Sequence, residues 1–210
     1  MYIAPHNNFS FIHLNKTGGI SAVRYMETHL KNFYCLGTWS IHRPLKSVVL
    51  HAMGAALVAM IRNPYDRYES LYAYRKMKYQ QGTVPLHSMH DQWLISDGNF
   101  LAQNMGFEAW MTGILKSDSY TELPLSELLE PWPNNLRLIR LEDIQTDLPA
   151  FLGVDCSLFP VPHINASFLT ITAKNSFNRT YIEWPVELQR EVWDREERIF
   201  TNYYPKEERP

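Results

Sequence analysis

The chain has 210 residues, of which 45% are hydrophobic and 20% charged, and its formal net charge is −2. These values exclude a wholly disordered chain, and they disfavour a general nucleic-acid-binding protein, which is normally basic overall. The length predicts one domain, residues 1–210, with a sizeable core. The longest apolar run, residues 53–61, is too short for a membrane-spanning helix, and the N-terminus lacks the pattern of a secretory signal, so we expect a cytoplasmic protein without an integral membrane segment.

The first strand–turn–helix unit lies near the N-terminus. Residues 9–14 are apolar and aromatic and end at turn-forming residues, which predicts a short buried strand. Residues 20–30 carry apolar side chains at helical spacing with charges between them, which predicts an amphipathic helix. The sequence NKTGG, residues 15–19, joins the two and is called the first turn below.

A second unit of the same kind follows. Residues 57–61 form a continuous apolar run, which is typical of a central parallel strand covered on both faces. Asn63 is a good helix N-cap and Pro64 suits the first helical position. We therefore expect residues 62–64, the second turn, to lead into a helix. A further short strand is expected at residues 47–50.

Strands and helices continue to alternate along the rest of the chain. The expected elements are a helix at 100–115, a strand at 136–141 leading into a short helix, mostly loop at 153–178, and a helix at 184–200. In the last helix one face is apolar and two i,i+4 ion pairs lie on the other; these residues are Leu188, Val192 and Ile199, and the pairs Glu191–Arg195 and Asp194–Arg198. The alternation predicts an α/β fold with a central, mostly parallel sheet flanked by helices.

Two cysteines, Cys35 and Cys156, lie far apart and show no metal-ligand spacing. A chain of this size with two cysteines needs no disulfide framework, so we expect both to be small core residues. No metal site is predicted.

The first turn has the chemistry of a phosphate-binding turn. Gly18 and Gly19 allow close approach of an anion, and the N–H groups at the start of the next helix carry partial positive charge. Lys16 adds a full charge, and Thr17 and Ser21 add hydroxyl donors. The alternative is a glycine-rich turn with an exposed lysine. In a Walker A loop the lysine follows the glycines, whereas Lys16 precedes them, so an ordinary ATP or GTP site is disfavoured.

The second turn offers a second anion-binding group. Arg62 ends a strand, and arginine suits multidentate phosphate recognition. Arg67 and Ser70 lie on the following helix. The alternative is that Arg62 pairs with a carboxylate such as Asp66. Because ligands of α/β sheets bind at the carboxyl ends of strands, we expect both turns to lie at one edge and to face one cleft.

Together the two turns resemble the donor-binding motifs of sulfotransferases that use 3′-phosphoadenosine 5′-phosphosulfate (PAPS). FIHLNKTGGIS is similar to the 5′-phosphosulfate loop, I-P-K-T-G-G-T-S, of the branch with heparan-sulfate 2-O- and chondroitin-type enzymes and their bacterial relatives. RNPYDRYESLY resembles the 3′-phosphate-binding segment of that family, R-[ND]-P-x-[DE]-R-x-x-S-x-Y. LIRLEDI and FTNYYP resemble later stretches of the family, so the likeness covers nearly the whole chain and implies a P-loop-like three-layer fold.

The resemblance implies a role for each matching residue. Lys16 would contact the oxygen that joins sulfate to phosphate and stabilise charge on the leaving nucleotide. The 5′-phosphate would be wrapped by Thr17, Gly18, Gly19, Ile20 and Ser21. Arg62 and Ser70 would hold the 3′-phosphate. The sequence departs from the family pattern at Asn15, which is usually proline, and at Ile20, which is usually threonine; we expect weaker or altered donor contacts from these changes.

On the acceptor side, the resemblance implies transfer to a hydroxyl group, with a carbohydrate as one candidate. His42 occupies the place where histidine-using relatives keep their catalytic base, although a structural or exposed His42 remains an alternative and some relatives use glutamate. His13 is expected to be structural, whereas His87 and His90 lie in a polar segment suited to the acceptor mouth. Trp39, Trp93 and Trp110 are candidates for stacking on a sugar, but aromatic side chains in such segments are more often core residues.

Two other functions stay open from the sequence. One is a nucleotide or small-molecule kinase, which the position of Lys16 disfavours. The other is a binding module that keeps the nucleotide fold without turnover, to which Asn15 and Ile20 give weight.

Overall fold

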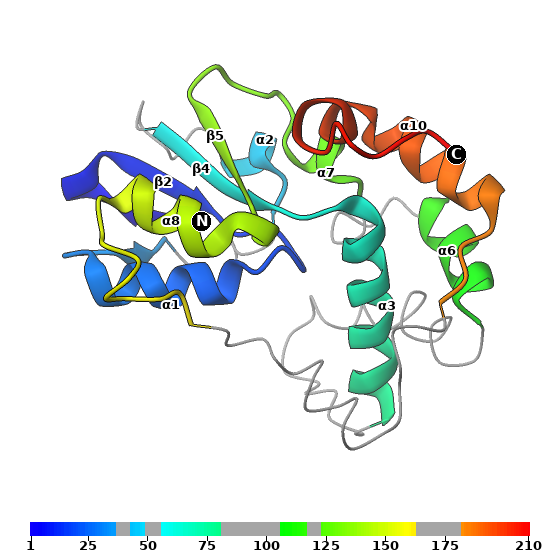
Figure 1. Cartoon of the computed structure of the whole chain (residues 1–210), viewed down its shortest axis with the longest axis horizontal. Helices are drawn as coiled ribbons and strands as arrows, with labels where there is room; N and C mark the ends of the chain where they lie inside the picture. The colour runs from blue at the N-terminus through cyan, green and yellow to red at the C-terminus, as the bar shows by residue number, and fades with distance from the viewer. Residues whose placement is uncertain (37–42, 49–55, 81–105, 117–122, 163–181) are drawn as a thin grey trace.

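The computed structural model describes residues 1–36, 43–48, 56–80, 106–116, 123–162 and 182–210. Its centre is a five-stranded sheet in the order β3-β1-β2-β4-β5 (Figure 1). The strands are β1 (Tyr2–Ala4), β2 (Phe9–Ile12), β3 (Tyr34–Cys35), β4 (Ala56–Ile61) and β5 (Leu136–Arg140). The three strands expected from the first turn, the second turn and residues 136–141 are therefore confirmed, within two residues at each end.

The sheet is mixed, with a parallel core. β2 pairs with β4 and β4 with β5 in parallel, whereas β1 runs antiparallel to both β2 and β3. The parallel arrangement expected from the sequence is confirmed for β2, β4 and β5. The antiparallel edge arises because a short 3₁₀ turn, Pro5–Asn7, folds β1 back onto β2.

Helices connect and cover these strands. They are α1 (Gly19–His29), α2 (Leu45–Val48), α3 (Pro64–Gln80), α6 (Phe107–Leu115), α7 (Leu125–Leu128), α8 (Ile144–Leu152) and α10 (Val186–Tyr203). The strand predicted at 47–50 is wrong where it is described, because residues 47 and 48 belong to α2 and residues 49–50 lie outside the described ranges. Leu45 and Val48 are three residues apart and both fully buried, so a helical turn buries the two side chains together.

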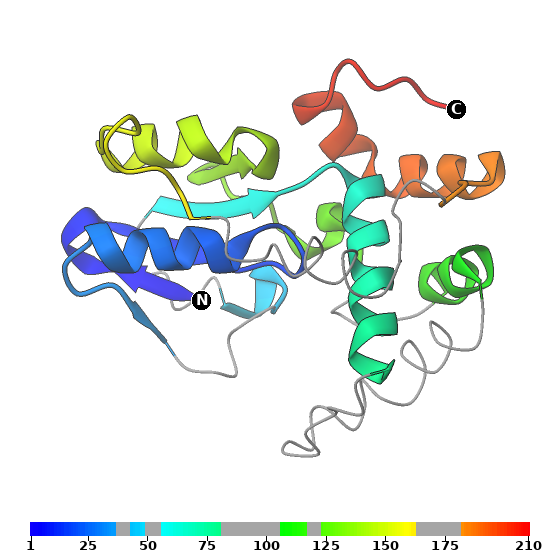
Figure 2. The ribbon, with the colours of Figure 1, turned by 60° about the horizontal axis from the view of Figure 1, so that its bottom comes forward.

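Helices pack on both faces of the sheet. In β4, Leu57, Ala59 and Ile61 join one core with α3, α6, α7 and α10. Val58 and Met60 join a second core with α1 and α8, because successive side chains of a strand point to opposite faces. In Figure 2, α1 and α8 lie alongside β4, whereas α6 and α10 lie beyond its carboxyl end, next to α3. The flanked, layered sheet expected from the continuous apolar run is confirmed.

The last helix largely follows its predicted pattern. Leu188, Val192 and Ile199 are buried, and Arg195 Nη2 lies 3.3 Å from Glu191 Oε1. The predicted pair of residues 194 and 198 is wrong, because the C-terminal segment folds back along α10. Asp194 pairs instead with Arg209, at 2.8 Å. The Arg198 guanidinium lies 4.0 Å from the centroid of the Trp132 ring.

The cysteines differ from their predicted burial. Cys35 in β3 is partly exposed, and Cys156 is exposed in the turn that follows α8. In this turn the backbone N–H and hydroxyl of Ser157 both donate to Asp155, so the segment is held by local polar contacts rather than by burial. Among the described residues, no three or more His, Cys, Asp and Glu side chains are arranged to hold a metal ion. None of the helices in the described ranges is long and apolar enough to cross a membrane.

Candidate functional site

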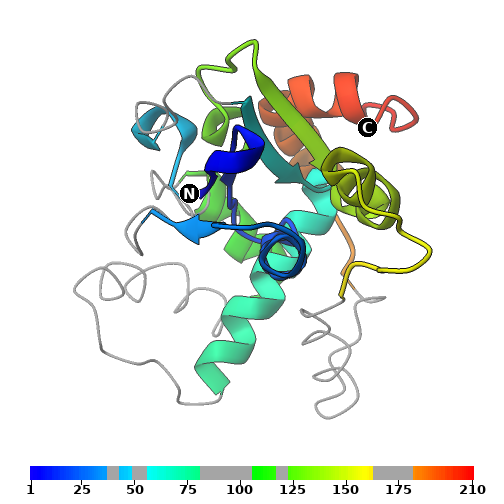
Figure 3. The same cartoon turned by 90° about the vertical axis from the view of Figure 1, so that its left-hand side faces the viewer.

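The parallel register places the two turns at the same edge of the sheet. Ile12, the last residue of β2, is opposite Ala59 of β4, and Ile61 at the end of β4 is opposite Arg140 of β5. β2 leads through the first turn into α1, and β4 leads through the second turn into α3. Figure 3 looks nearly along the axis of α1 and shows α3 descending past it from the sheet. The expectation that both turns lie at one carboxyl edge is confirmed.

The first turn has an unusual backbone. Lys16 and Gly18 both lie in the left-handed region, with φ of 64° and 80°, and Thr17 between them does not. Alternation of this kind turns successive N–H groups toward one side and produces anion-binding concavities. The left-handed region costs an ordinary residue such as lysine about 1–2 kcal/mol. Neighbouring contacts must therefore hold Lys16 in place.

Hydrogen bonds from the side chains of Thr17 and Arg67 hold the backbone of the turn in place. The Thr17 hydroxyl is fully buried and donates to the Leu14 carbonyl at 3.0 Å. The Nε of Arg67, on α3, donates to the Asn15 carbonyl at 3.2 Å. The Thr17 hydroxyl thus serves the turn itself, and what this residue can offer a phosphate is its backbone N–H.

Both glycines of the turn are closely approached by other side chains. A Cβ on Gly18 would lie 2.3 Å from Leu141 Cδ1, and one on Gly19 would lie 1.9 Å from Cδ2 of the His13 ring. His13 is 7% exposed, which agrees with the structural role expected for it. Close packing is therefore one explanation for glycine at both positions, and the anion binding suggested by the sequence is another.

Helix α1 begins at the end of this turn. Gly18 is its N-cap and supplies no side-chain hydrogen bond to it, and the first bond of the helix runs from Ala22 N to Gly18 O at 3.2 Å. The side chain of Ile20 is 41% exposed beside this start. A helix start without a capping side chain leaves backbone N–H groups that attract an anion.

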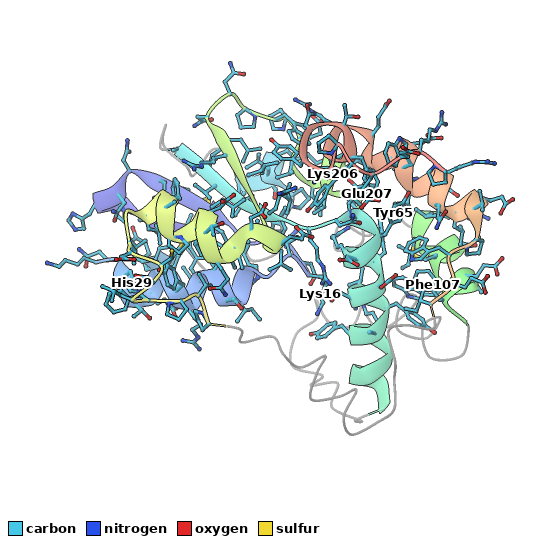
Figure 4. The ribbon with its side chains drawn as sticks, in the orientation of Figure 1. Lys16, His29, Tyr65, Phe107, Lys206 and Glu207 are labelled. Atoms are coloured by element: carbon cyan, nitrogen blue, oxygen red, sulfur yellow. The ribbon has the colours of Figure 1, made fainter. Side chains whose placement is uncertain are left out.

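Helix α3 lies against the first turn. Lys16 Nζ is 4.4 Å from the centroid of the Tyr74 ring, and Figure 4 shows the lysine reaching toward α3. Arg67, Ser70 and Tyr74 are spaced i, i+3 and i+7, so they share one face of the helix. Since Arg67 and Tyr74 both contact the first turn, Ser70 between them faces the same turn; it is 7% exposed. From the sequence, Arg67 was named without a role and Tyr74 was missed, although the spacing of residues 67, 70 and 74 already placed them on one helix face.

Arg67 links the first turn to the last helix. Its side chain is fully buried, as is that of Glu196 on α10, and the two interact electrostatically. Glu196 also accepts hydrogen bonds from the N–H groups of Leu125 at 2.7 Å and Ser126 at 2.9 Å. Burial raises the pKa of the Glu196 carboxyl to about 7, although Arg67 and these N–H groups oppose the rise.

The second turn has the predicted cap. Asn63 Oδ1 accepts the Tyr65 N–H at 3.0 Å, and Pro64 is the first residue of α3. Glu142 accepts the Asn63 N–H at 3.0 Å and the Tyr204 hydroxyl at 2.9 Å. Glu207 accepts the Asn63 amide at 3.1 Å, and Figure 4 shows it beside Tyr65. Carboxylates therefore surround the start of α3, so an anion would be held there by side chains such as Arg62 and Ser70 rather than by the helix start.

Part of the predicted site lies outside the described residues. His42, the predicted base, and His87 and His90 belong to this part, and so do Trp39 and Trp93. Trp110 is fully buried in the core, as expected. The identity of the base, and the pairing of Arg62, stay predictions.

No protein-family model, curated protein or solved structure matched the chain. The functional interpretation therefore depends on the residues of this chain.

Proposed function

We propose that the protein transfers a sulfuryl group from PAPS to a hydroxyl acceptor, with a carbohydrate hydroxyl as one candidate. The observation that carries the proposal is the meeting of the first turn with the Arg67–Ser70–Tyr74 face of α3. Arg67 bonds to Asn15 and the Lys16 ammonium lies over Tyr74, so the lysine and Ser70 belong to one locality at the edge of the sheet. A donor with two separate anionic groups needs such a pairing.

Each end of the donor has its own partners in this proposal. The 5′-phosphate is held by backbone N–H groups of residues 17–20, with Lys16 and the Ser21 hydroxyl beside them. The 3′-phosphate is held by Arg62 and Ser70. The left-handed residues of the first turn and the start of α1 support the first assignment, because both direct backbone N–H groups toward an anion.

The reaction then needs little covalent chemistry from the protein. The acceptor oxygen attacks sulfur, and the bond between sulfur and the oxygen of the 5′-phosphate breaks. The nucleotide leaves as 3′,5′-adenosine bisphosphate, and the acceptor proton passes to a base, for which His42 is proposed. Lys16 donates to the bridging oxygen as negative charge develops there, an interaction that is stronger in the transition state than in the ground state.

Transfer of labelled sulfate from PAPS to a pool of mono- and oligosaccharide acceptors tests this proposal. We expect wild-type protein to label an acceptor and Lys16→Met to reduce kcat by about 100- to 1,000-fold, as loss of a charge-stabilising donor does elsewhere. Lys31→Met is the matched control, since Lys31 is exposed just beyond the opposite end of α1.

Two results would contradict the proposal. One is transfer that is unaffected by Lys16→Met. The other is tight binding of 3′,5′-adenosine bisphosphate without transfer to any acceptor, which would favour a non-catalytic nucleotide-binding module.

A further inference from the structure

We propose that Tyr74 is a positioning residue for Lys16: its ring holds the lysine ammonium where it meets the bridging oxygen of the donor. This inference rests on the proposed function, and it deepens that function by adding a residue that neither the motif nor its resemblance assigns. Tyr74 would not touch the reacting atoms and would act through Lys16.

The contact itself is within the range of a cation–π interaction. Lys16 Nζ lies 4.4 Å from the centroid of the Tyr74 ring, and such contacts hold a cation within about 6 Å of the ring face. An ammonium has three N–H donors. Contact with a ring face does not use all three donors, so the same ammonium can also meet an oxygen of the nucleotide.

The hydrogen bonds at Asn15 and Thr17 hold the backbone of the first turn rather than the lysine side chain. A lysine side chain has a flexible four-carbon stem. Its backbone is held on either side, through the Asn15 carbonyl and the Thr17 hydroxyl, but these bonds do not orient the ammonium. The Tyr74 ring supplies that orientation from a helix, which is a more rigid support than a loop.

The place of Tyr74 on α3 gives the contact a second consequence. Ser70 lies one turn earlier on the same face, and Arg67 fastens that face to the first turn at 3.2 Å. One helix thus sets both the position of the Lys16 ammonium and that of the Ser70 hydroxyl. A single rigid helix then fixes the separation between the groups that would hold the two anionic ends of a bound donor.

Removal of the ring should affect turnover more than donor affinity. Lys16 would still reach the donor, but it would be distributed over more conformations when charge develops on the bridging oxygen. We expect Tyr74→Leu to lower kcat by about 2- to 30-fold, the range of a cation–π contact, with KM for PAPS changed less than about twofold. Tyr74→Phe keeps the ring face and should restore most of kcat.

A double-mutant cycle separates positioning from a merely structural role. In a Lys16→Met background, Tyr74→Leu should cause no further loss of kcat, because its effect passes through the lysine. Tyr34→Leu is the control for loss of an exposed tyrosine, since Tyr34 is 49% exposed in the edge strand β3. An equal loss of kcat in both backgrounds, or a Tyr74→Phe variant as slow as Tyr74→Leu, would overturn the proposal.

A measurement without nucleotide distinguishes failure of this inference from failure of the proposed function. In the NMR spectrum of the free protein, the ε-methylene protons of Lys16 should be shifted upfield by the ring in wild type and in Tyr74→Phe, but not in Tyr74→Leu. Lys16→Met assigns the signal. Absence of the shift in wild type overturns the role of Tyr74, even if sulfate transfer is found. A shift with no transfer to any acceptor overturns the proposed function, and the positioning role with it.

Discussion

The two helices that begin at the carboxyl edge of the sheet start in opposite ways. Helix α1 follows the left-handed Lys16 and starts from a left-handed glycine N-cap, Gly18, which supplies no side-chain hydrogen bond. Helix α3 starts from Asn63, whose side chain caps it and whose backbone N–H donates to Glu142. The backbone of the first start has the features that attract an anion, whereas the N–H groups at the second start already donate to side-chain oxygens of the protein.

The difference predicts how each end of a doubly anionic ligand is recognised. At α1, recognition comes from backbone N–H groups, which are fixed by the fold and depend on the glycines. At α3 it comes from the side chains of Arg62 and Ser70, because the carboxylates of Glu142 and Glu207 lie beside the helix start. Substitutions in the first turn should therefore change both the stability of the fold and the affinity for the ligand. Substitutions in the second turn should change one of these without the other.

The largest effect is expected for Gly18→Ala. A left-handed backbone costs alanine about 1–2 kcal/mol, and the overlap with Leu141 adds about 1–3 kcal/mol, so we expect a loss of about 2–4 kcal/mol in unfolding free energy. Urea denaturation measures it. Gly153→Ala is the matched control, because Gly153 is also left-handed (φ of 69°) but a Cβ there meets no described atom within 4 Å. Equal losses in the two variants would show that Leu141 does not constrain the turn.

A pH-dependent effect is expected from Glu196, whose buried carboxyl group interacts with the buried Arg67. Its pKa is raised from 4.5 to about 7, so the folded state binds its proton more tightly than the unfolded state does. Stability from this group is greatest below pH 4.5, falls as the pH rises to about 7, and changes no further above it. The loss is up to about 3 kcal/mol.

Urea denaturation between pH 4.5 and 8 tests this pH dependence. Arg67 and Tyr68 on α3 and the N–H groups of Leu125 and Ser126 on α7 face the carboxyl group. Glu196→Gln should flatten the curve between pH 4.5 and 7, while the exposed Glu191→Gln should not. A wild-type and a Glu196→Gln curve with the same slope would contradict the assignment.

The smallest effect is expected at the start of α3. Asn63→Ala removes the cap and should cost about 1 kcal/mol of stability, while Asn63→Ser keeps a capping oxygen and should recover most of it. Because the cap is separate from the anion contacts, both variants should bind 3′,5′-adenosine bisphosphate with nearly wild-type affinity in calorimetry. A large loss of affinity in Asn63→Ser would mean that the two helix starts do not differ in the proposed way.

The sequence predicted best what depends on short-range patterns. Both strand–turn–helix units follow from continuous apolar runs and helical periodicity, and Asn63 and Pro64 marked the start of α3 correctly. The strand predicted at residues 47–50 failed because two apolar residues three positions apart suit a helical turn as well as a strand. Cys156 was placed in the core by residue type alone, whereas its position in a polar turn keeps it exposed.

What the sequence did not reveal depends on contacts between distant residues. The close packing against Gly18 comes from Leu141, more than a hundred residues away. The left-handed conformation of Lys16 and its contact with Tyr74 likewise need α3 to be packed against the turn. The spacing of residues 67, 70 and 74 indicated a common face of α3, but only the fold showed that this face meets the first turn.

The most direct test of a PAPS-type donor site is calorimetric titration with 3′,5′-adenosine bisphosphate, 5′-AMP and ATP. We predict that the bisphosphate binds about 10- to 150-fold more tightly than 5′-AMP, as expected for hydrogen bonds to a charged group, and also more tightly than ATP. Arg62→Met should remove most of that difference, whereas Arg24→Met, at an exposed ion pair on α1, should leave it unchanged. Equal binding of the bisphosphate and 5′-AMP, or tighter binding of ATP, would contradict the account.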